Sequence, residues 1–156
     1  ALDVGTGIGF FLPTLAERAS HVVGVDYSTD LKYAARFMLA KRDISNVLLC
    51  RTDARLLPFR SETFDLAVCL SVMEHIPEPG EAFQELNRVL KDSGVAVVGW
   101  PMEHLLFRFV RQVEFHLLRP KAWKTIRDME EQGRDPWHIV RWKRIEESLR
   151  PYFLIE

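Results

Sequence analysis

Residues 3–9 have the sequence Asp-Val-Gly-Thr-Gly-Ile-Gly, between an apolar start and a helix that we expect to begin near Phe10. Glycines in such a loop let the backbone turn sharply and let a ligand contact the main chain. A tight strand-to-helix turn without a ligand is the alternative interpretation. A dinucleotide fingerprint would need its third glycine at position 10, where the bulky Phe10 should crowd a pyrophosphate. The spacing therefore favours a ligand without phosphates.

A carboxylate follows the next apolar run, because Asp26 comes directly after residues 21–25. In a parallel strand-helix-strand unit this position lies beside the glycine loop, and a carboxylate there can accept two hydrogen bonds from ribose hydroxyls. The alternative is an acid that caps the following helix, but Thr29 and Asp30 are better placed for capping. Asp26 is therefore a candidate ribose-binding residue.

Strand-like and helical segments alternate along the chain. The expected strands span residues 1–4, 21–25, 46–50, 64–70, 94–100 and, in part, 152–155. Apolar residues at helical spacing form two stripes, Leu31, Ala34, Ala35, Met38 and Leu39 and then Ala82, Phe83, Leu86, Val89 and Leu90. The second helix should end in a left-handed cap at Gly94. The alternation predicts an α/β fold with a Rossmann-like, doubly wound, mostly parallel sheet of order 3-2-1-4-5 plus a partial sixth strand.

Residues 102–137 interrupt this alternation with helical patterns and no strand candidate. We expect them to form a helical insertion after the fifth strand and a lid over a substrate pocket, within a single domain of residues 1–156 that looks truncated at both ends. Their apolar side chains favour an apolar or aromatic substrate. Arg108 and Arg111 would also suit a membrane surface, which is the less favoured partner. A contact between subunits is the alternative, and the sequence leaves the oligomeric state open.

The composition narrows the class of protein. The 156 residues carry 21 basic and 22 acidic side chains, a formal net charge of −1, which lacks the basic excess typical of nucleic-acid binding. No apolar run is long enough to cross a bilayer. Cys50 and Cys69 have no metal-binding spacing, so we expect no metal, two buried thiols in neighbouring strands and a reducing, cytoplasmic environment.

Two more motifs follow expected strands. Asp53-Ala54 comes just after the third strand, where an aspartate can accept a hydrogen bond from an exocyclic amine such as that of adenine, although a simple Asx-turn is the rival interpretation. Glu74-His75 follows the fourth strand. We expect Glu74 to be a solvated or capping carboxylate.

The order of these motifs resembles the class I S-adenosylmethionine-dependent methyltransferases. It is most similar to the subgroup of ubiquinone- and menaquinone-type C-methyltransferases and many small-molecule O- and N-methyltransferases. The resemblance extends from residue 1 to about residue 100 and includes, after the glycine loop, Val-Asp, Asp-Ala, Leu-Pro-Phe, Phe-Asp-Leu, Glu-His-Ile and Leu-Asn-Arg-Val-Leu-Lys-x-x-Gly. It implies S-adenosyl-L-methionine as the cofactor and methyl transfer to an oxygen, nitrogen or carbon atom of a small molecule.

The resemblance also implies roles for individual residues. The methionine part and the ribose of the cofactor would be surrounded by Asp3, Gly5, Thr6, Gly7 and Gly9. Asp26 would hold the ribose hydroxyls, and the adenine would contact Tyr27, Asp53 and Ala54. The catalytic side of the cofactor would lie along Leu70 and Ser71.

Methyl transfer from a sulfonium is a direct displacement with a neutral leaving group, so alignment in a dry pocket is the main requirement and can contribute roughly 7–11 kcal/mol. A base is needed only when the nucleophile starts protonated. His75 is the candidate base because imidazole titrates near neutral pH. The alternative is that His75 orders its loop or caps the next helix.

Three other functions compete with this one. A non-catalytic S-adenosylmethionine-binding paralogue remains open. The glycine spacing and the absence of a Tyr-x-x-x-Lys pair argue against a nicotinamide-dependent oxidoreductase. Methylation of nucleic-acid bases is disfavoured because residues 70–73 lack an Asn-Pro-Pro-Tyr or Asp-Pro-Pro-Tyr element.

Overall fold

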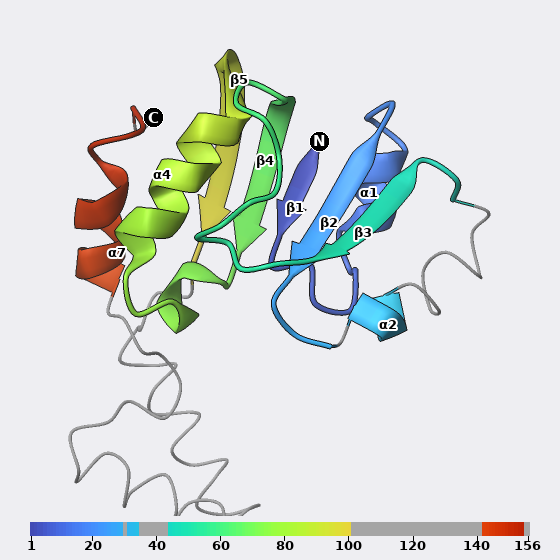
Figure 1. The fold of residues 1–156 in the computed structure, drawn as a ribbon, viewed down its shortest axis with the longest axis horizontal. Coiled ribbons are helices and arrows are strands. Elements are labelled where there is room, and N and C mark those ends of the chain that lie inside the picture. Colours follow the sequence, from blue (N-terminus) through green and yellow to red (C-terminus); the bar gives the residue numbers. More distant parts are fainter. Residues whose placement is uncertain (30, 35–43, 101–141, 155–156) are drawn as a thin grey trace, which may run out of the picture.

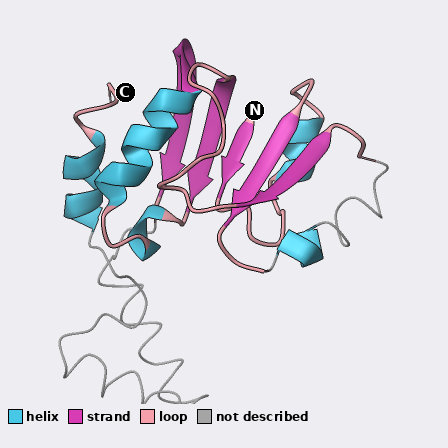
Figure 2. Ribbon diagram, in the orientation of Figure 1, coloured by secondary structure: helices cyan, strands magenta, loops and turns pink. Residues whose placement is uncertain are grey.

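The computed structural model describes residues 1–29, 31–34, 44–100 and 142–154. Its sheet has five strands in the order β3-β2-β1-β4-β5, and every neighbouring pair is parallel (Figures 1 and 2). The strands are β1 (Leu2–Val4), β2 (Val22–Asp26), β3 (Val47–Arg51), β4 (Phe64–Leu70) and β5 (Leu90–Gly99). The predicted fold class and strand order are confirmed.

Helices cover both faces of this sheet (Figure 1). The described helices are α1 (Leu12–Ala16), α2 (Leu31–Ala34), the 3₁₀ turn η2 (Met73–His75), α4 (Pro79–Val89) and α7 (Trp142–Leu149). One core cluster joins the sheet to α4 and α7 and includes Phe83, Leu86 and Ile145. A second cluster joins it to α1 and α2 through Leu12 and Ala34. Because helices lie on both faces, the central strands β1, β2 and β4 have nearly continuous apolar sequences.

The start of the fifth strand and the cap at Gly94 differ from the prediction. Strand β5 begins at Leu90, immediately after α4, and only Gly5, Gly7 and Gly9 among the described glycines have positive φ, so Gly94 is not a left-handed cap. A Cβ at Gly94 would lie 2.9 Å from the Lys91 carbonyl oxygen of its own strand and 3.1 Å from the Phe64 carbonyl oxygen of β4, so glycine permits the close approach of these backbone groups.

The thiols do not lie in neighbouring strands. Cys69 is buried in β4 and Cys50 is partly exposed in the edge strand β3, with β2 and β1 between them. Consecutive strands along the chain are separated here because the sheet order reverses at β1.

The expected sixth strand is also absent from the described part of residues 152–155. The amides of Tyr152 and Phe153 donate to the Leu149 carbonyl, so the chain turns at the end of α7, and the Phe153 ring contacts Phe83 instead of joining the sheet. Ile155, the second half of the first helical stripe and the insertion at 102–137 lie outside the described residues. Within the described ranges no helix is long and apolar enough to span a membrane.

Candidate functional site

The glycine loop between β1 and α1 is built by three left-handed glycines. Gly5, Gly7 and Gly9 have φ values of +73°, +52° and +82°, a region that L-residues with a Cβ rarely adopt. The amides of Gly5 and Thr6 both donate to the Val25 carbonyl, at 2.8 and 2.9 Å, which ties the loop to the end of β2. The loop therefore lies at the carboxyl edge of the sheet, the lower edge in Figure 1.

Gly5 and Gly7 are needed for different reasons. A Cβ at Gly5 would lie 2.1 Å from Cγ2 of Val72, in the loop after β4, so Gly5 permits close packing. A Cβ at Gly7 would meet nothing within 4 Å. The space above Gly7 is therefore open to a ligand that approaches the main chain.

The Asp26 carboxylate connects two segments at this edge. Its Oδ2 accepts the Gly7 amide at 2.7 Å, and its Oδ1 accepts the Ser28 amide at 2.8 Å. A carboxylate has about four acceptor sites, so further acceptor capacity remains on both oxygens. Both hydrogen bonds hold Asp26 to the glycine loop and to its own turn rather than to α2, and the ribose-binding role stays a prediction.

Asp3 supports the loop from below. Its carboxyl is buried and accepts a 2.5 Å hydrogen bond from the Thr6 hydroxyl. Burial raises the pKa of Asp3, the Thr6 hydrogen bond opposes that rise, and the charge of Asp26 adds to it. Asp3 and Thr6 do not line the cavity described below, so their hydrogen bond supports the conformation of the glycine loop.

Asp53 is held by Arg55. Its carboxylate accepts from the Arg55 backbone amide at 2.9 Å and from the guanidinium Nη2 at 2.7 Å, with Nε shared between both oxygens at 3.1 and 3.3 Å. These hydrogen bonds lower the pKa of Asp53. The amide contact is the Asx-turn that competed with a binding role, yet Asp53 also lines the cavity, so the two interpretations are compatible.

The loop after β4 closes the other side. Ser71 has φ +55°, a strained value for serine, and its amide donates to the Gly99 carbonyl at 2.8 Å. Such outliers persist where the surrounding structure holds them, often at functional sites. Ser71 lines the cavity, whereas Leu70 does not.

Glu74 is buried, so the prediction of a solvated or capping carboxylate is wrong. Its side chain is 3 % exposed, and its Oε2 has no hydrogen-bond partner among the described residues. Its Oε1 lies 4.0 Å from Nε2 of His75, whose side chain is 57 % exposed and lines the cavity. The 3₁₀ turn η2 thus places the Glu74 side chain in the interior and the His75 side chain at the surface.

These segments enclose a cavity of about 790 Å³. Of the sequence-predicted residues, the cavity brings together Gly5, Gly7, Asp26, Tyr27, Asp53, Ala54, Ser71 and His75; it does not include Asp3, Thr6, Gly9 and Leu70. Residues that sequence reasoning missed are Val4, Val25, Ser28, Thr52, Arg55, Val72, Ile76 and Pro77. Nearly all of them adjoin a recognised motif, so a margin of one or two residues around each motif would have found them.

Phe10 lies outside the lining of this cavity, and 76 % of the residue is exposed. The expected clash between Phe10 and a pyrophosphate stays a prediction.

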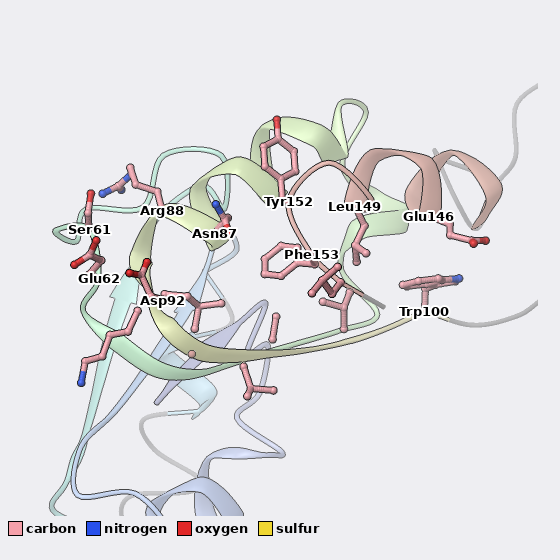
Figure 3. A pocket seen from close by; sticks show the side chains of 17 residues that line it. Ser61, Glu62, Asn87, Arg88, Asp92, Trp100, Glu146, Leu149, Tyr152 and Phe153 are labelled. Atoms are coloured by element: carbon pink, nitrogen blue, oxygen red, sulfur yellow. The ribbon is translucent and has the colours of Figure 1, made fainter. Parts of the chain in front are cut away.

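A larger hollow of about 930 Å³ lies elsewhere, between β5, α4 and the end of α7 (Figure 3). Trp100, Leu149 and Phe153 form its apolar part, and Asp92 and Glu62 lie at its far end. It includes none of the glycine-loop or strand-end acids. The described residues contain no group of three or more His, Cys, Asp or Glu side chains able to hold a metal ion. The 790 Å³ cavity is therefore the candidate site.

Comparisons with known proteins agree with this geometry. A family model described as a methyltransferase domain matches residues 2–98. The phosphatidylethanolamine N-methyltransferase of Cereibacter sphaeroides is 35 % identical over 98 residues, which cover 62 % of this chain and 48 % of that protein. The ubiquinone biosynthesis O-methyltransferase of Hahella chejuensis is 32 % identical over 90 residues, 58 % of this chain and 38 % of that protein.

Solved structures share the fold. A SAM-dependent methyltransferase from Aquifex aeolicus superposes with a TM-score of 0.58 at 28 % identity, over 62 % of this chain and 53 % of that one. The [4+2]-cyclase SpnF superposes with a TM-score of 0.70 at 25 % identity, over 97 % of this chain and 48 % of that one.

The chain belongs to the class I S-adenosylmethionine-dependent methyltransferase family, and S-adenosylmethionine is the cofactor of that family. It spans less than half the length of the two curated relatives described above.

Proposed function

We propose that the protein transfers a methyl group from S-adenosylmethionine to an oxygen or nitrogen atom of a small molecule with apolar or aromatic character. The observation that carries the proposal is the arrangement at the carboxyl edge of the sheet. There, the open main chain at Gly7 and the carboxylates of Asp26 and Asp53 line one cavity.

The chemistry of the donors fits this cofactor. Asp26 keeps acceptor capacity for ribose hydroxyls. Asp53 and Ala54 follow β3, which is two strands from β1 and its glycine loop, and would meet the purine amine. Tyr27, whose side chain is 72 % exposed, offers an aromatic ring beside the same cavity. When bound, S-adenosylmethionine would supply an electrophilic methyl group on a positively charged sulfur.

The chain's own residues would contribute alignment, exclusion of water and, for a protonated nucleophile, a base. Val72, Ile76 and Pro77 give one wall of the cavity an apolar surface. His75 on the same wall would take the proton of an acceptor hydroxyl or ammonium at an imidazole nitrogen. The N- and O-methyltransferase names of the two relatives support an amine or hydroxyl acceptor.

A non-catalytic or differently catalytic role is the second candidate, favoured by the resemblance to a protein titled a [4+2]-cyclase. A direct test is calorimetry with S-adenosylhomocysteine and with NAD, on the wild type and on Asp26→Ala. We expect binding of S-adenosylhomocysteine only, weakened about tenfold or more in the variant, because hydrogen bonds to a charged acceptor contribute about 1.5–3 kcal/mol each.

Turnover separates the two candidates. Formation of S-adenosylhomocysteine from S-adenosylmethionine in the presence of a library of amines, phenols and catechols is the expected result. Tight cofactor binding without turnover on any acceptor would favour the non-catalytic role, and equal affinity in Asp26→Ala would remove Asp26 from the site.

A further inference from the structure

Arg55 is a residue of the cavity that sequence analysis did not single out. It comes two residues after Asp53, in the segment that follows β3, and its guanidinium forms a bidentate contact with the Asp53 carboxylate. Nη1 of Arg55 also lies 3.8 Å from Oε2 of Glu81, in the first turn of α4. The Arg55 guanidinium therefore lies between the Asp53 carboxylate, which lines the cavity, and the first turn of α4.

Counting donors and acceptors shows what this contact leaves available. Arg55 directs three N–H groups at Asp53: its backbone amide, Nε–H and Nη2–H. An ionised carboxylate offers about four acceptor sites, so one remains. Oδ1 accepts the backbone amide at 2.9 Å and the closer share of Nε–H at 3.1 Å, whereas Oδ2 accepts Nη2–H at 2.7 Å and only the longer share of Nε–H at 3.3 Å. The remaining acceptor site therefore lies on Oδ2.

We propose that Arg55 is a positioning residue for base recognition, which fixes Asp53 so that the cavity accepts a 6-aminopurine and disfavours a 6-oxopurine. The proposal rests on the proposed function of the cavity as a nucleoside-cofactor site. An amino group at position 6 donates to the free acceptor of Asp53. A 6-oxo group presents an acceptor there and moves the donor to N1, and a carboxylate held by a fork of N–H groups cannot turn to follow it.

The charge of Arg55 has a second effect on the same carboxylate. Its hydrogen bonds lower the pKa of Asp53, which keeps the acceptor ionised into acid solution. Without Arg55 the Asp53 pKa should rise, and base discrimination should fade at a higher pH than in the wild type. Orientation and ionisation can thus be separated experimentally.

The experiment compares S-adenosylhomocysteine with its deaminated 6-oxo counterpart, S-inosylhomocysteine, by calorimetry on four proteins: wild type, Arg55→Gln, Arg55→Lys and Arg60→Gln. Arg60 is an exposed arginine of the same segment that does not line the cavity, so its variant is the matched control. We expect the wild type and Arg60→Gln to prefer the adenine compound by at least about tenfold, and Arg55→Gln to lose about tenfold of that preference.

Arg55→Lys keeps a positive charge but not the two-pronged contact. It should lose base preference like Arg55→Gln while retaining more of the wild-type pH profile. Unchanged preference in both Arg55 variants, or tighter binding of the adenine compound when Arg55 is removed, would overturn the assignment and leave the proposed function intact. No binding of either compound by the wild type would overturn both. Thermal unfolding of each variant shows whether a lost preference comes from a lost fold.

Discussion

At the scale of single residues, the three aspartates of the motifs have different physical roles. Asp26 joins the glycine loop to the turn after β2, Asp3 is buried beneath the loop, and Asp53 is clamped by Arg55. The sequence shows the three as similar carboxylates within or just after apolar strands. Only their hydrogen-bond partners separate a ligand-facing acid from a supporting one.

His75 is the residue on which a chemical role can be tested most directly. Replacement by alanine should lower turnover on a protonated acceptor by about 100-fold or more, because general base catalysis typically contributes that much. Affinity for S-adenosylhomocysteine should stay within about twofold, since the Asp26 and Asp53 contacts persist. The measurements are steady-state kinetics across pH and calorimetry.

His21 provides the control for that variant. It is exposed before β2 and outside the cavity, so His21→Ala should leave turnover unchanged. Equal turnover of His75→Ala and wild type at every pH would make His75 a structural residue of η2.

At the scale of elements, two glycines of the loop between β1 and α1 have different surroundings: Gly5 packs closely against Val72, and Gly7 faces open space. Gly5→Ala would place a Cβ against Val72 in a strained backbone, and we expect a loss of unfolding free energy of about 3 kcal/mol or more. The new Cβ of Gly7→Ala would meet no atom within 4 Å, so the unfolding free energy should fall only by the backbone strain, about 1–2 kcal/mol. Denaturant titration measures both.

The pair also differs in ligand binding. Gly7→Ala should fold yet bind S-adenosylhomocysteine more weakly, because its methyl group would enter the cavity. The double variant Gly5→Ala with Val72→Ala should recover part of the stability that Gly5→Ala loses. Similar stability of the two single glycine variants would show that the Val72 contact is unimportant.

A set of hydrogen bonds from Arg88 and Glu85 joins the segment after β3 to α4. Arg88 donates to the carbonyls of Leu57 and Phe59 at 3.0 and 2.8 Å and forms a bidentate pair with Glu85, which in turn accepts the Leu57 amide. Arg88→Ala should lower the unfolding free energy by about 2 kcal/mol, the range of charge-assisted hydrogen bonds at a partly exposed site. Arg60→Ala, without such contacts, is the control.

The effect of Arg88 should depend on pH. Its hydrogen bond lowers the pKa of Glu85 in the folded protein, so the stability that Glu85 contributes is present above its unfolded pKa and is lost as pH falls through the folded value. The difference between Arg88→Ala and wild type should therefore narrow in acid. A difference that is constant from neutral pH to acid would contradict the role of the ion pair.

At the scale of the whole molecule, burial of Asp3 acts on stability with the opposite sign. Its folded pKa is raised, mainly by desolvation, so its contribution is fully present below the unfolded pKa and is lost as pH rises through the folded value. Asp3→Asn keeps an oxygen for the Thr6 hydroxyl and should gain stability relative to wild type as pH rises toward neutral. Chemical denaturation at several pH values measures the difference.

Asp65 supplies the control for Asp3. It is an exposed partner of Lys91, and that contact lowers the pKa of Asp65. Asp65→Asn should therefore lose stability relative to wild type over the same rise in pH. Parallel pH profiles for the two variants would show that burial of Asp3 does not govern its titration.

The strand positions were predictable because hydrophobic periodicity is local, as the agreement at β1 to β4 shows, and the strand order followed from the strand-helix alternation and right-handed crossovers. The errors fall where a distant contact decides the structure. A Cβ at Gly94 would lie 3.1 Å from the carbonyl oxygen of Phe64 in β4, and Glu74 is enclosed by packing of η2 on α4 and α7. The clamp of Arg55 on Asp53 is local, but one arginine two residues after an aspartate carries no pattern that separates it from a surface ion pair.

The place of β1 in the sheet has a consequence for how the chain must assemble. Of the five described strands, the one that comes earliest along the chain is the central one, with β2 on one side and β4, 65 residues later in the register of Asp3 with Val68, on the other. Closing so long a loop costs conformational entropy before any contact repays it. On a ribosome, β1 can pair with β2 early, but one of its edges stays open until β4 has emerged. The glycine loop, which follows β1 and packs against Val72, therefore takes its final shape only after the loop that follows β4 has been made.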